Sequence, residues 1–174
     1  MNKVILYIAM SVDGFIADKD GGVSWLDPFN DVDFGYKKFI DSIGSLIMGA
    51  KTYEQVLSFG DWPYKNKKSY VLTHRSLQTP LGEDIEFVDG DVESITRKAK
   101  DAAGDKNVWL VGGASVVASF LNKQAIDEMM IFIIPTLLNE GIPLFQGATE
   151  KSSLKLLNTE SYSNGALLLH YGLK

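Results

Sequence analysis

Three short segments of the sequence have the composition of phosphate-binding turns, and each directly follows an apolar run. The first consists of Val111, Gly112, Gly113, Ala114, Ser115 and Val116. An apolar run enters the two glycines, and a helical pattern leaves them. A helix N-terminus offers unpaired N–H groups and partial positive charge, and glycine lets a phosphate approach the backbone. Two glycines alone fit equally well a tight turn that binds no ligand.

The other two segments place hydroxyl and basic side chains after an apolar run. They consist of Gly49, Lys51 and Thr52, and of Thr73, His74 and Arg75. The planar arginine fork suits phosphate, and a threonine near a helix start bonds either a phosphate oxygen or the helix's own N–H groups. Taken singly, the second segment also fits an ordinary helix cap, and the third also fits a solvated loop.

The three segments together indicate more than each one alone. In an open α/β sheet, ligands bind outside the carboxyl ends of the strands. Three phosphate-compatible turns at one edge therefore predict a dinucleotide site. The sequence contains neither Gly-x-Gly-x-x-Gly nor a P-loop lysine motif. This argues against an ordinary Rossmann domain and against a P-loop protein.

The composition argues against several other kinds of site and partner. The 174-residue chain contains no cysteine and two histidines, so disulfides, thiolate catalysis and a metal site are not expected. Its net charge of −5 argues against binding to nucleic acid. No apolar run approaches the ~20 residues that span a bilayer, and the N-terminal run is too short for a signal peptide. We expect a cytoplasmic protein without a membrane or nucleic-acid partner.

Hydrophobic periodicity predicts the elements that position these segments. Buried strands are expected at residues 4–10, 45–48, 69–72, 85–88, 108–111 and 129–134, and helices at 32–43, 52–57, 92–102 and 114–121. Residues 18–31 read as a long loop, and strands at 154–162 and 166–171 flank the hairpin turn Asn164-Gly165. This order predicts one α/β domain over residues 1–174, with three αβα layers, a mainly parallel mixed sheet and an antiparallel C-terminal hairpin.

The succession of motifs resembles the dihydrofolate reductases and, more closely, the reductase domain of riboflavin biosynthesis and its stand-alone relatives. The resemblance covers almost the whole chain. It rests on residues 11–17, 47–53, 71–75, 111–114, 126–128, 135–138 and 141–145. It implies a dihydrofolate-reductase-like fold with NADPH as cofactor and an activity like that of 5-amino-6-(5-phosphoribosylamino)uracil reductase or dihydrofolate reductase.

The resemblance also implies a role for each segment. Gly49, Lys51 and Thr52 would lie near the pyrophosphate, and Thr73, His74 and Arg75 near the adenosine 2′-phosphate. The segment from Val111 to Val116 would line the nicotinamide and the pyrophosphate. Ala9 would border the nicotinamide, and Trp25 resembles the tryptophan of the mobile active-site loop.

A reductase also needs a proton, and three acids are candidate donors besides a bound water. Folate enzymes carry one acid on the first helix. Counting back from Gly49 gives Asp33, which we prefer, and counting forward from Trp25 gives Asp31. A helix cap fits either residue as well. Asp13 follows the first strand and either faces the nicotinamide or shapes the Asp13-Gly14 turn.

Three positions depart from the two families. Phe132 stands where folate enzymes have the threonine that partners their acid, and Val117 stands in place of a tyrosine. Val111 replaces the acid common in riboflavin reductases. We therefore expect hydride transfer from NADPH to a C=N or C=O bond of a small pterin- or pyrimidine-like heterocycle, without naming the substrate. The alternatives are an NADP(H)-binding protein without turnover and a purely structural domain.

A homodimer is also expected, because the run from Met129 to Ile134 is long and apolar and riboflavin-type relatives commonly pair through their sheets. The other interpretation is that this strand lies wholly inside the monomer core.

Overall fold

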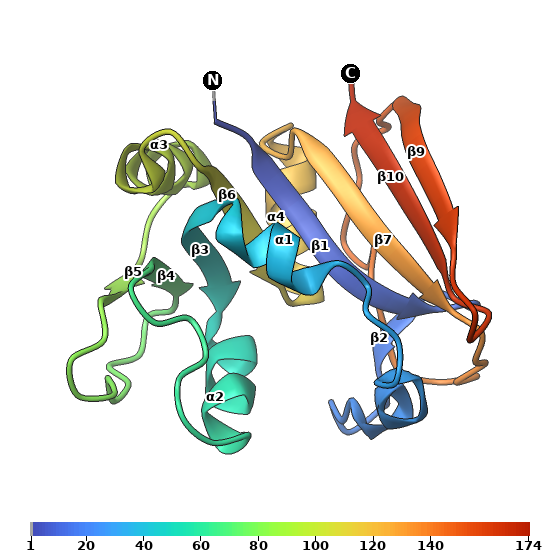
Figure 1. Cartoon of the computed structure of the whole chain (residues 1–174). Coiled ribbons are helices and arrows are strands. Elements are labelled where there is room, and N and C mark those ends of the chain that lie inside the picture. Colours follow the sequence, from blue (N-terminus) through green and yellow to red (C-terminus); the bar gives the residue numbers. More distant parts are fainter. Residues whose placement is uncertain (1) are drawn as a thin grey trace.

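The computed structural model describes residues 2–174, which form an eight-stranded sheet in the order β5-β4-β3-β6-β1-β7-β10-β9 and a small two-stranded sheet (Figure 1). The strands of the larger sheet are β1 Val4–Ser11, β3 Ile43–Gly49, β4 Lys68–Leu72, β5 Ile85–Val88, β6 Asn107–Gly112, β7 Glu128–Ile134, β9 Leu154–Ser161 and β10 Leu167–Leu173. The helices are α1 Tyr36–Asp41, α2 Ala50–Ser58, α3 Val92–Ala103 and α4 Ala114–Asn122.

The sheet has the predicted mixed character. All pairings from β5 across to β7 are parallel, whereas β10 runs antiparallel to both β7 and β9. The C-terminal hairpin turns at Asn164-Gly165, where Gly165 has a φ of 87°. This positive φ is why glycine is needed there. The predicted α/β class, mainly parallel sheet and antiparallel hairpin are confirmed.

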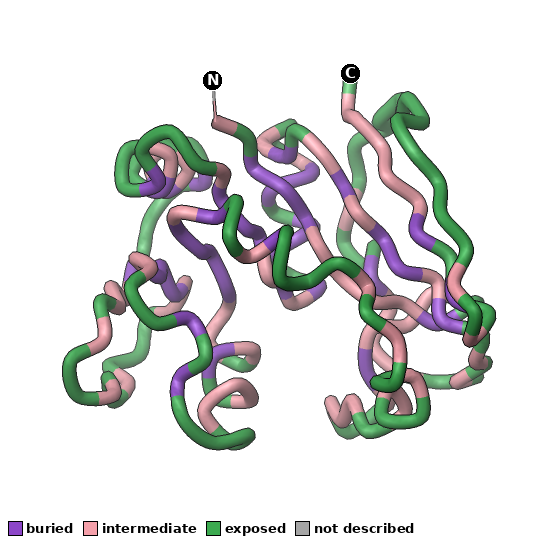
Figure 2. Tube along the Cα trace, viewed as in Figure 1, coloured by how far each residue is buried: buried purple, intermediate pink, exposed green. Residues whose placement is uncertain are grey.

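Helices cover both faces of the sheet, which gives the three predicted layers. Helices α3 and α4 pack on one face, against residues such as Leu6 and Leu110. Helices α1 and α2 pack on the other face, against residues such as Ile5 and Trp109. Strand β1 is therefore buried on both sides, which explains its unbroken apolar sequence. Figure 2 shows this burial running through the central strands, whereas β9 is exposed along its length.

The first helix is much shorter than predicted. A helix over residues 32–43 was expected, but α1 begins at Tyr36 after Gly35, whose φ of 73° is left-handed. The expectation that Asp31 or Asp33 caps this helix was wrong, because the N-cap is Gly35. The Asp33 carboxylate instead accepts a hydrogen bond from the Gly35 N–H at 2.8 Å. This is a local turn of the kind that aspartate favours over helix.

Periodicity did not indicate the short elements that follow β1, one of which lies inside the loop predicted at residues 18–31. Strand β2, Phe15–Ala17, pairs with β8, Ile142–Pro143, and a 3₁₀ helix, η1, spans Ser24–Phe29. These short pieces depend on partners far along the chain, so their local sequence carries little signal. None of the helices within residues 2–174 is long and apolar enough to cross a membrane.

Candidate nucleotide and substrate site

The N-termini of α2 and α4 lie against each other at the carboxyl edge of the sheet. A Cβ atom added at Gly49 would lie 3.0 Å from Cγ2 of Val116, and one at Gly113 would lie 3.5 Å from Oγ1 of Thr52. Thr52 lies in the first turn of α2. It does not cap this helix, because the N-cap is Gly49. The first two predicted segments meet as the sequence indicated.

Both helix starts keep their N–H groups free of side-chain caps. Among residues 2–174, no side chain caps α2 at Gly49 or α4 at Gly113, whereas the Asp91 carboxylate caps α3 by accepting from the Ser94 N–H. Uncapped N–H groups carrying the positive end of the helix dipole form an anion site. Two such ends placed together suit a pyrophosphate.

Glycine at position 112 is required by the backbone. Gly112 ends β6 with a φ of +124°, a conformation that side chains disfavour. The peptide bond between Gly112 and Gly113 is cis. Gly113 itself has a φ of −78°, which any residue adopts. The backbone angles therefore do not require glycine at position 113. What a side chain there would change is the space between Gly113 and Thr52, into which its Cβ would point.

A pocket of about 240 Å³ opens beside α4, between the ends of β4 and β5. Its hydroxyl and imidazole groups come from Thr73 and His74 at the end of β4 and from Ser115 and Ser119 on α4. The remaining lining residues are Leu72, Val88, Asp89, Gly90 and Val116. Thr73 and His74 of the third predicted segment thus line one cavity with Ser115 and Val116 of the first, whereas Arg75 is not among the lining residues. Lys51 is exposed on the first turn of α2.

The two basic groups predicted at the end of β4 are already paired with acids. His74 Nδ1 lies 2.7 Å from Asp89 Oδ2. Arg75 donates two hydrogen bonds to the Glu54 carboxylate, at 3.1 and 2.8 Å, and these bonds lower the pKa of Glu54. Neither Asp89 nor Glu54 was predicted from the sequence. Asp89-Gly90 carries the same signal as the other segments, because a polar residue and a glycine directly follow a buried strand.

A group of aromatic residues lies beside Ala9. Phe132 pairs with Ala9 in the β1–β7 register. The Phe132 ring centroid is 4.7 Å from that of Tyr7 and 5.6 Å from that of Phe34. The indole Nε1 of Trp25, packed against this group, is buried and has no hydrogen-bond partner among residues 2–174. An unpaired buried donor of this kind is satisfied by a ligand acceptor or a water.

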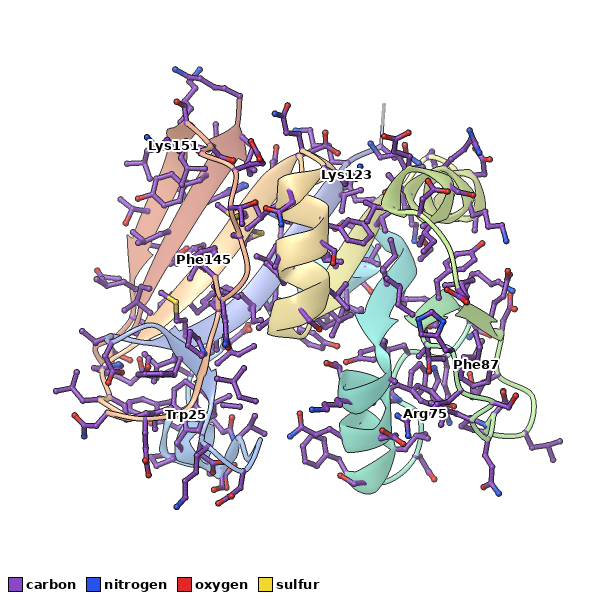
Figure 3. The ribbon with its side chains drawn as sticks, turned by 180° about the vertical axis from the view of Figure 1, so that it is seen from behind. Trp25, Arg75, Phe87, Lys123, Phe145 and Lys151 are labelled. Atoms are coloured by element: carbon purple, nitrogen blue, oxygen red, sulfur yellow. The ribbon has the colours of Figure 1, made fainter. Side chains whose placement is uncertain are left out.

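Trp25 and Arg75 lie at the same edge of the molecule, whereas Lys123, just after α4, lies at the opposite edge (Figure 3). The loop that contains Gly21 is held against α2, because Gln55 Nε2 on α2 donates a hydrogen bond to the Gly21 carbonyl at 2.7 Å. This hydrogen bond was not predicted, since it joins two segments that only the fold brings together.

The three candidate acids have different surroundings. The Asp13 carboxylate accepts hydrogen bonds from Ser11 Oγ at 2.6 Å and from the backbone N–H of Asn139 at 2.7 Å. These bonds hold the pKa of Asp13 below its usual value, so it stays ionised near neutral pH and mainly braces the loop. Asp31 is exposed.

Asp33 lies next to the aromatic group. Burial is the main cause of the raised pKa of both Tyr7 and Tyr162, and the negative charge of Asp33 contributes to each. Asp33 is itself exposed, like Asp31, and the residue that follows it, Phe34, belongs to the aromatic group.

The family model of the RibD C-terminal domain matches residues 2–168. The chain belongs to the RibD C-terminal domain family. As a member of that family, it is 39% identical over 171 residues to the uncharacterised protein YwjB of Bacillus subtilis, covering 97% of each chain. It is also 34% identical over 122 residues to the dihydrofolate reductase HdrB of Haloferax volcanii, covering 68% of this chain and 59% of that one.

Solved structures place this RibD C-terminal domain in the predicted fold. A Shewanella sp. PV-4 protein, provisionally assigned to riboflavin biosynthesis, superposes with a TM-score of 0.87, 32% identity and 99% coverage of both chains. The dihydrofolate reductase of Enterococcus faecalis, solved with NADP(H), gives a TM-score of 0.66 at 19% identity, covering 99% of this chain and 96% of that one. The dihydrofolate-reductase-like fold predicted from the sequence is confirmed.

Proposed function

We propose that this protein is an NADPH-dependent reductase acting on a small pterin- or pyrimidine-like heterocycle. The observation that carries the proposal is the meeting of two uncapped helix N-termini beside a polar pocket at the carboxyl edge of the sheet. The family and the fold are those of reductases, which supports the same class of reaction. Because family members differ in substrate, the specific heterocycle stays open.

The residues present fit a nicotinamide dinucleotide. The N–H groups after Gly49 and Gly113 would bind the pyrophosphate. The pocket lined by Thr73, His74 and Ser115 would hold the adenosine end. When bound, the cofactor supplies the hydride.

The chain's own contribution is to orient the heterocycle, keep water out and provide a proton. The half-buried rings of Phe34 and Tyr162, supported by the buried ring of Phe132, would contact the flat faces of the heterocycle. Asp33 or a water that it orients would supply the proton.

The proposal is tested by titrating the purified protein with NADPH and then following NADPH consumption. The substrates to compare are dihydrofolate and 5-amino-6-(5-phosphoribosylamino)uracil. NADPH binding with turnover of the pyrimidine supports the proposal. Binding without turnover of any heterocycle offered would favour the alternative of a nucleotide-binding protein. Absence of any NADPH binding would contradict both.

We expect NADPH to bind more tightly than NADH, because Thr73, His74 and Arg75 surround one strand end. Replacing Arg75 with alanine should weaken NADPH binding by about tenfold and leave NADH binding unchanged, since one charge-assisted hydrogen-bond donor is lost. Arg97→Ala, which removes an exposed arginine from α3, is the matched control. Equal affinities of the unmodified protein for both nucleotides would contradict this assignment.

We also propose a homodimer, formed through a different surface from the one the sequence indicated. Strand β7 lies between β1 and β10, so it is interior. The edge pair β9 and β10 instead exposes Leu154, Leu156 and Leu167, each between 42% and 52% accessible. Their ladder partners place all three on one face of the sheet, and such a patch favours self-association.

Light scattering is expected to give twice the chain mass of 19.2 kDa. The Leu156→Glu variant should be a folded monomer, since it places a charge in the centre of the apolar patch. Leu81→Glu alters a fully exposed leucine in a loop and should leave the dimer intact. A monomeric unmodified protein at micromolar concentration would contradict the proposal.

A further inference from the structure

The pocket that would hold the adenosine end contains an acid that does not suit a 2′-phosphate. Asp89 follows β5 directly, lines the pocket together with Thr73 and His74, and lies 2.7 Å from the His74 ring. Asp89 is positioned by the strand itself, because the parallel pairing of β4 with β5 sets Leu72 beside Val88. The residues after these two strand ends, Thr73 and Asp89, must therefore be neighbours.

The basic side chains at this edge are paired with acidic side chains in the absence of a ligand. Arg75 is engaged by Glu54, and His74 by Asp89. These four groups sum to zero with a protonated imidazole and to −1 with a neutral one. A 2′-phosphate adds up to two further negative charges, and like charges at short range repel each other.

A carboxylate at such a strand end has a different natural ligand. In nucleotide-binding α/β sheets, an acid in this place accepts a hydrogen bond from the ribose 2′-hydroxyl, whereas arginine accommodates a 2′-phosphate. This edge of the sheet carries both kinds of group: Asp89 lines the pocket, whereas Arg75, two residues after Thr73, is not among its lining residues. Glu54 differs from Asp89, because it engages Arg75 from α2 and is not among the residues lining the pocket.

We propose that Asp89 is a specificity-determining residue that limits the preference of this site for a 2′-phosphate over a 2′-hydroxyl. The inference rests on the proposed function, namely that a nicotinamide dinucleotide binds here. Asp89 restrains the imidazole of His74 and places its own negative charge on the pocket wall. Its removal would free a donor for the 2′-phosphate and remove the repulsion.

The test compares Asp89→Asn with Asp105→Asn. Both variants remove one carboxylate from an exposed residue, but Asp105 lies between α3 and β6, at the opposite edge of the sheet. Adenosine 2′,5′-bisphosphate and adenosine 5′-monophosphate isolate the adenosine end, and NADPH and NADH are titrated in parallel. Calorimetry or ligand-induced thermal shift reports binding without turnover.

We expect Asp89→Asn to tighten binding of adenosine 2′,5′-bisphosphate and NADPH by about three- to tenfold, the size of one partly screened charge interaction. It should not tighten binding of the monophosphate or NADH, and Asp105→Asn should change nothing. If Asp89→Asn weakens all four ligands alike, Asp89 is structural and the inference is wrong. An unchanged ratio in Asp89→Asn and in a second variant, Asp89→Ser, would also overturn it.

Failure of the inference can be told apart from failure of the proposed function. Binding of both dinucleotides to the unmodified protein, together with an unaltered ratio in the variants, rejects only the role of Asp89. An unmodified protein that binds none of the four ligands rejects the nucleotide site itself.

Discussion

Replacing Gly113 with valine is expected to abolish NADPH binding, with a loss of at least about a hundredfold in affinity, while the fold survives. The fold should tolerate the change because Gly113 has an ordinary φ of −78°. An added Cβ would make only a normal contact, at 3.5 Å from Oγ1 of Thr52. The helix that follows also begins after position 113, so a β-branched residue does not interrupt it.

Binding should be lost because the two methyl groups of valine would occupy the space between the N-termini of α2 and α4. A phosphate must approach those N–H groups to within hydrogen-bonding distance. The measurement is a calorimetric titration with NADPH, combined with circular dichroism and thermal melting. Gly113→Ala is the graded control and should lose less affinity, since it adds a single methyl group. A folded Gly113→Val protein with normal NADPH affinity would show that the turn is purely structural.

Dihydrofolate is expected to be a poor substrate, with kcat/KM about a hundredfold or more below the ~10⁴ M⁻¹s⁻¹ at the lower end for efficient enzymes. A folate pocket, as the resemblance describes it, fixes the pterin with an acid and a hydroxyl. Here the corresponding residue on β7 is Phe132, which is 3% exposed and packed among aromatic rings. One pterin donor would be left without a partner, and the unmet hydrogen bond costs ~1–3 kcal/mol.

An isosteric pair of variants separates the missing hydroxyl from the bulk of the ring. Phe132→Thr and Phe132→Val leave cavities of nearly equal size, so the loss of packing is common to both. Steady-state kinetics should show more dihydrofolate turnover for the threonine variant than for the valine variant, by about tenfold. Efficient turnover by the unmodified protein would overturn the expectation and would show that another residue occupies the threonine's place.

The sequence alone determined the fold and the edge of the sheet at which the proposed nucleotide site lies. Periodicity marks the strands because a strand covered on both faces is a continuous apolar run, as β1 is from Val4 to Met10. The turns at Gly49 and Gly112-Gly113 were predictable since each belongs to one short strand–turn–helix unit. Parallel strands then bring such turns to one edge by topology.

The tertiary structure decided which charges meet at that edge. Glu54 and Arg75 are 21 residues apart, yet they form a bidentate pair. Asp89 reaches His74 only because β4 and β5 lie side by side. The local sequence around each basic residue does not indicate its acidic partner. Basic side chains that have no acid nearby in the sequence are therefore paired with one in the folded chain.

The same distinction explains the elements that were predicted wrongly or missed. The first helix was predicted to be longer because apolar residues recur at helical spacing, but Asp33 and Gly35 favour a turn locally. Strands β2 and β8 form by pairing with each other, although they are far apart in the sequence. Hydrophobic spacing is a property of each segment and can be read from the sequence. The partner that satisfies a hydrogen bond or a charge is a property of the folded chain, because it is set by contacts between residues far apart in sequence.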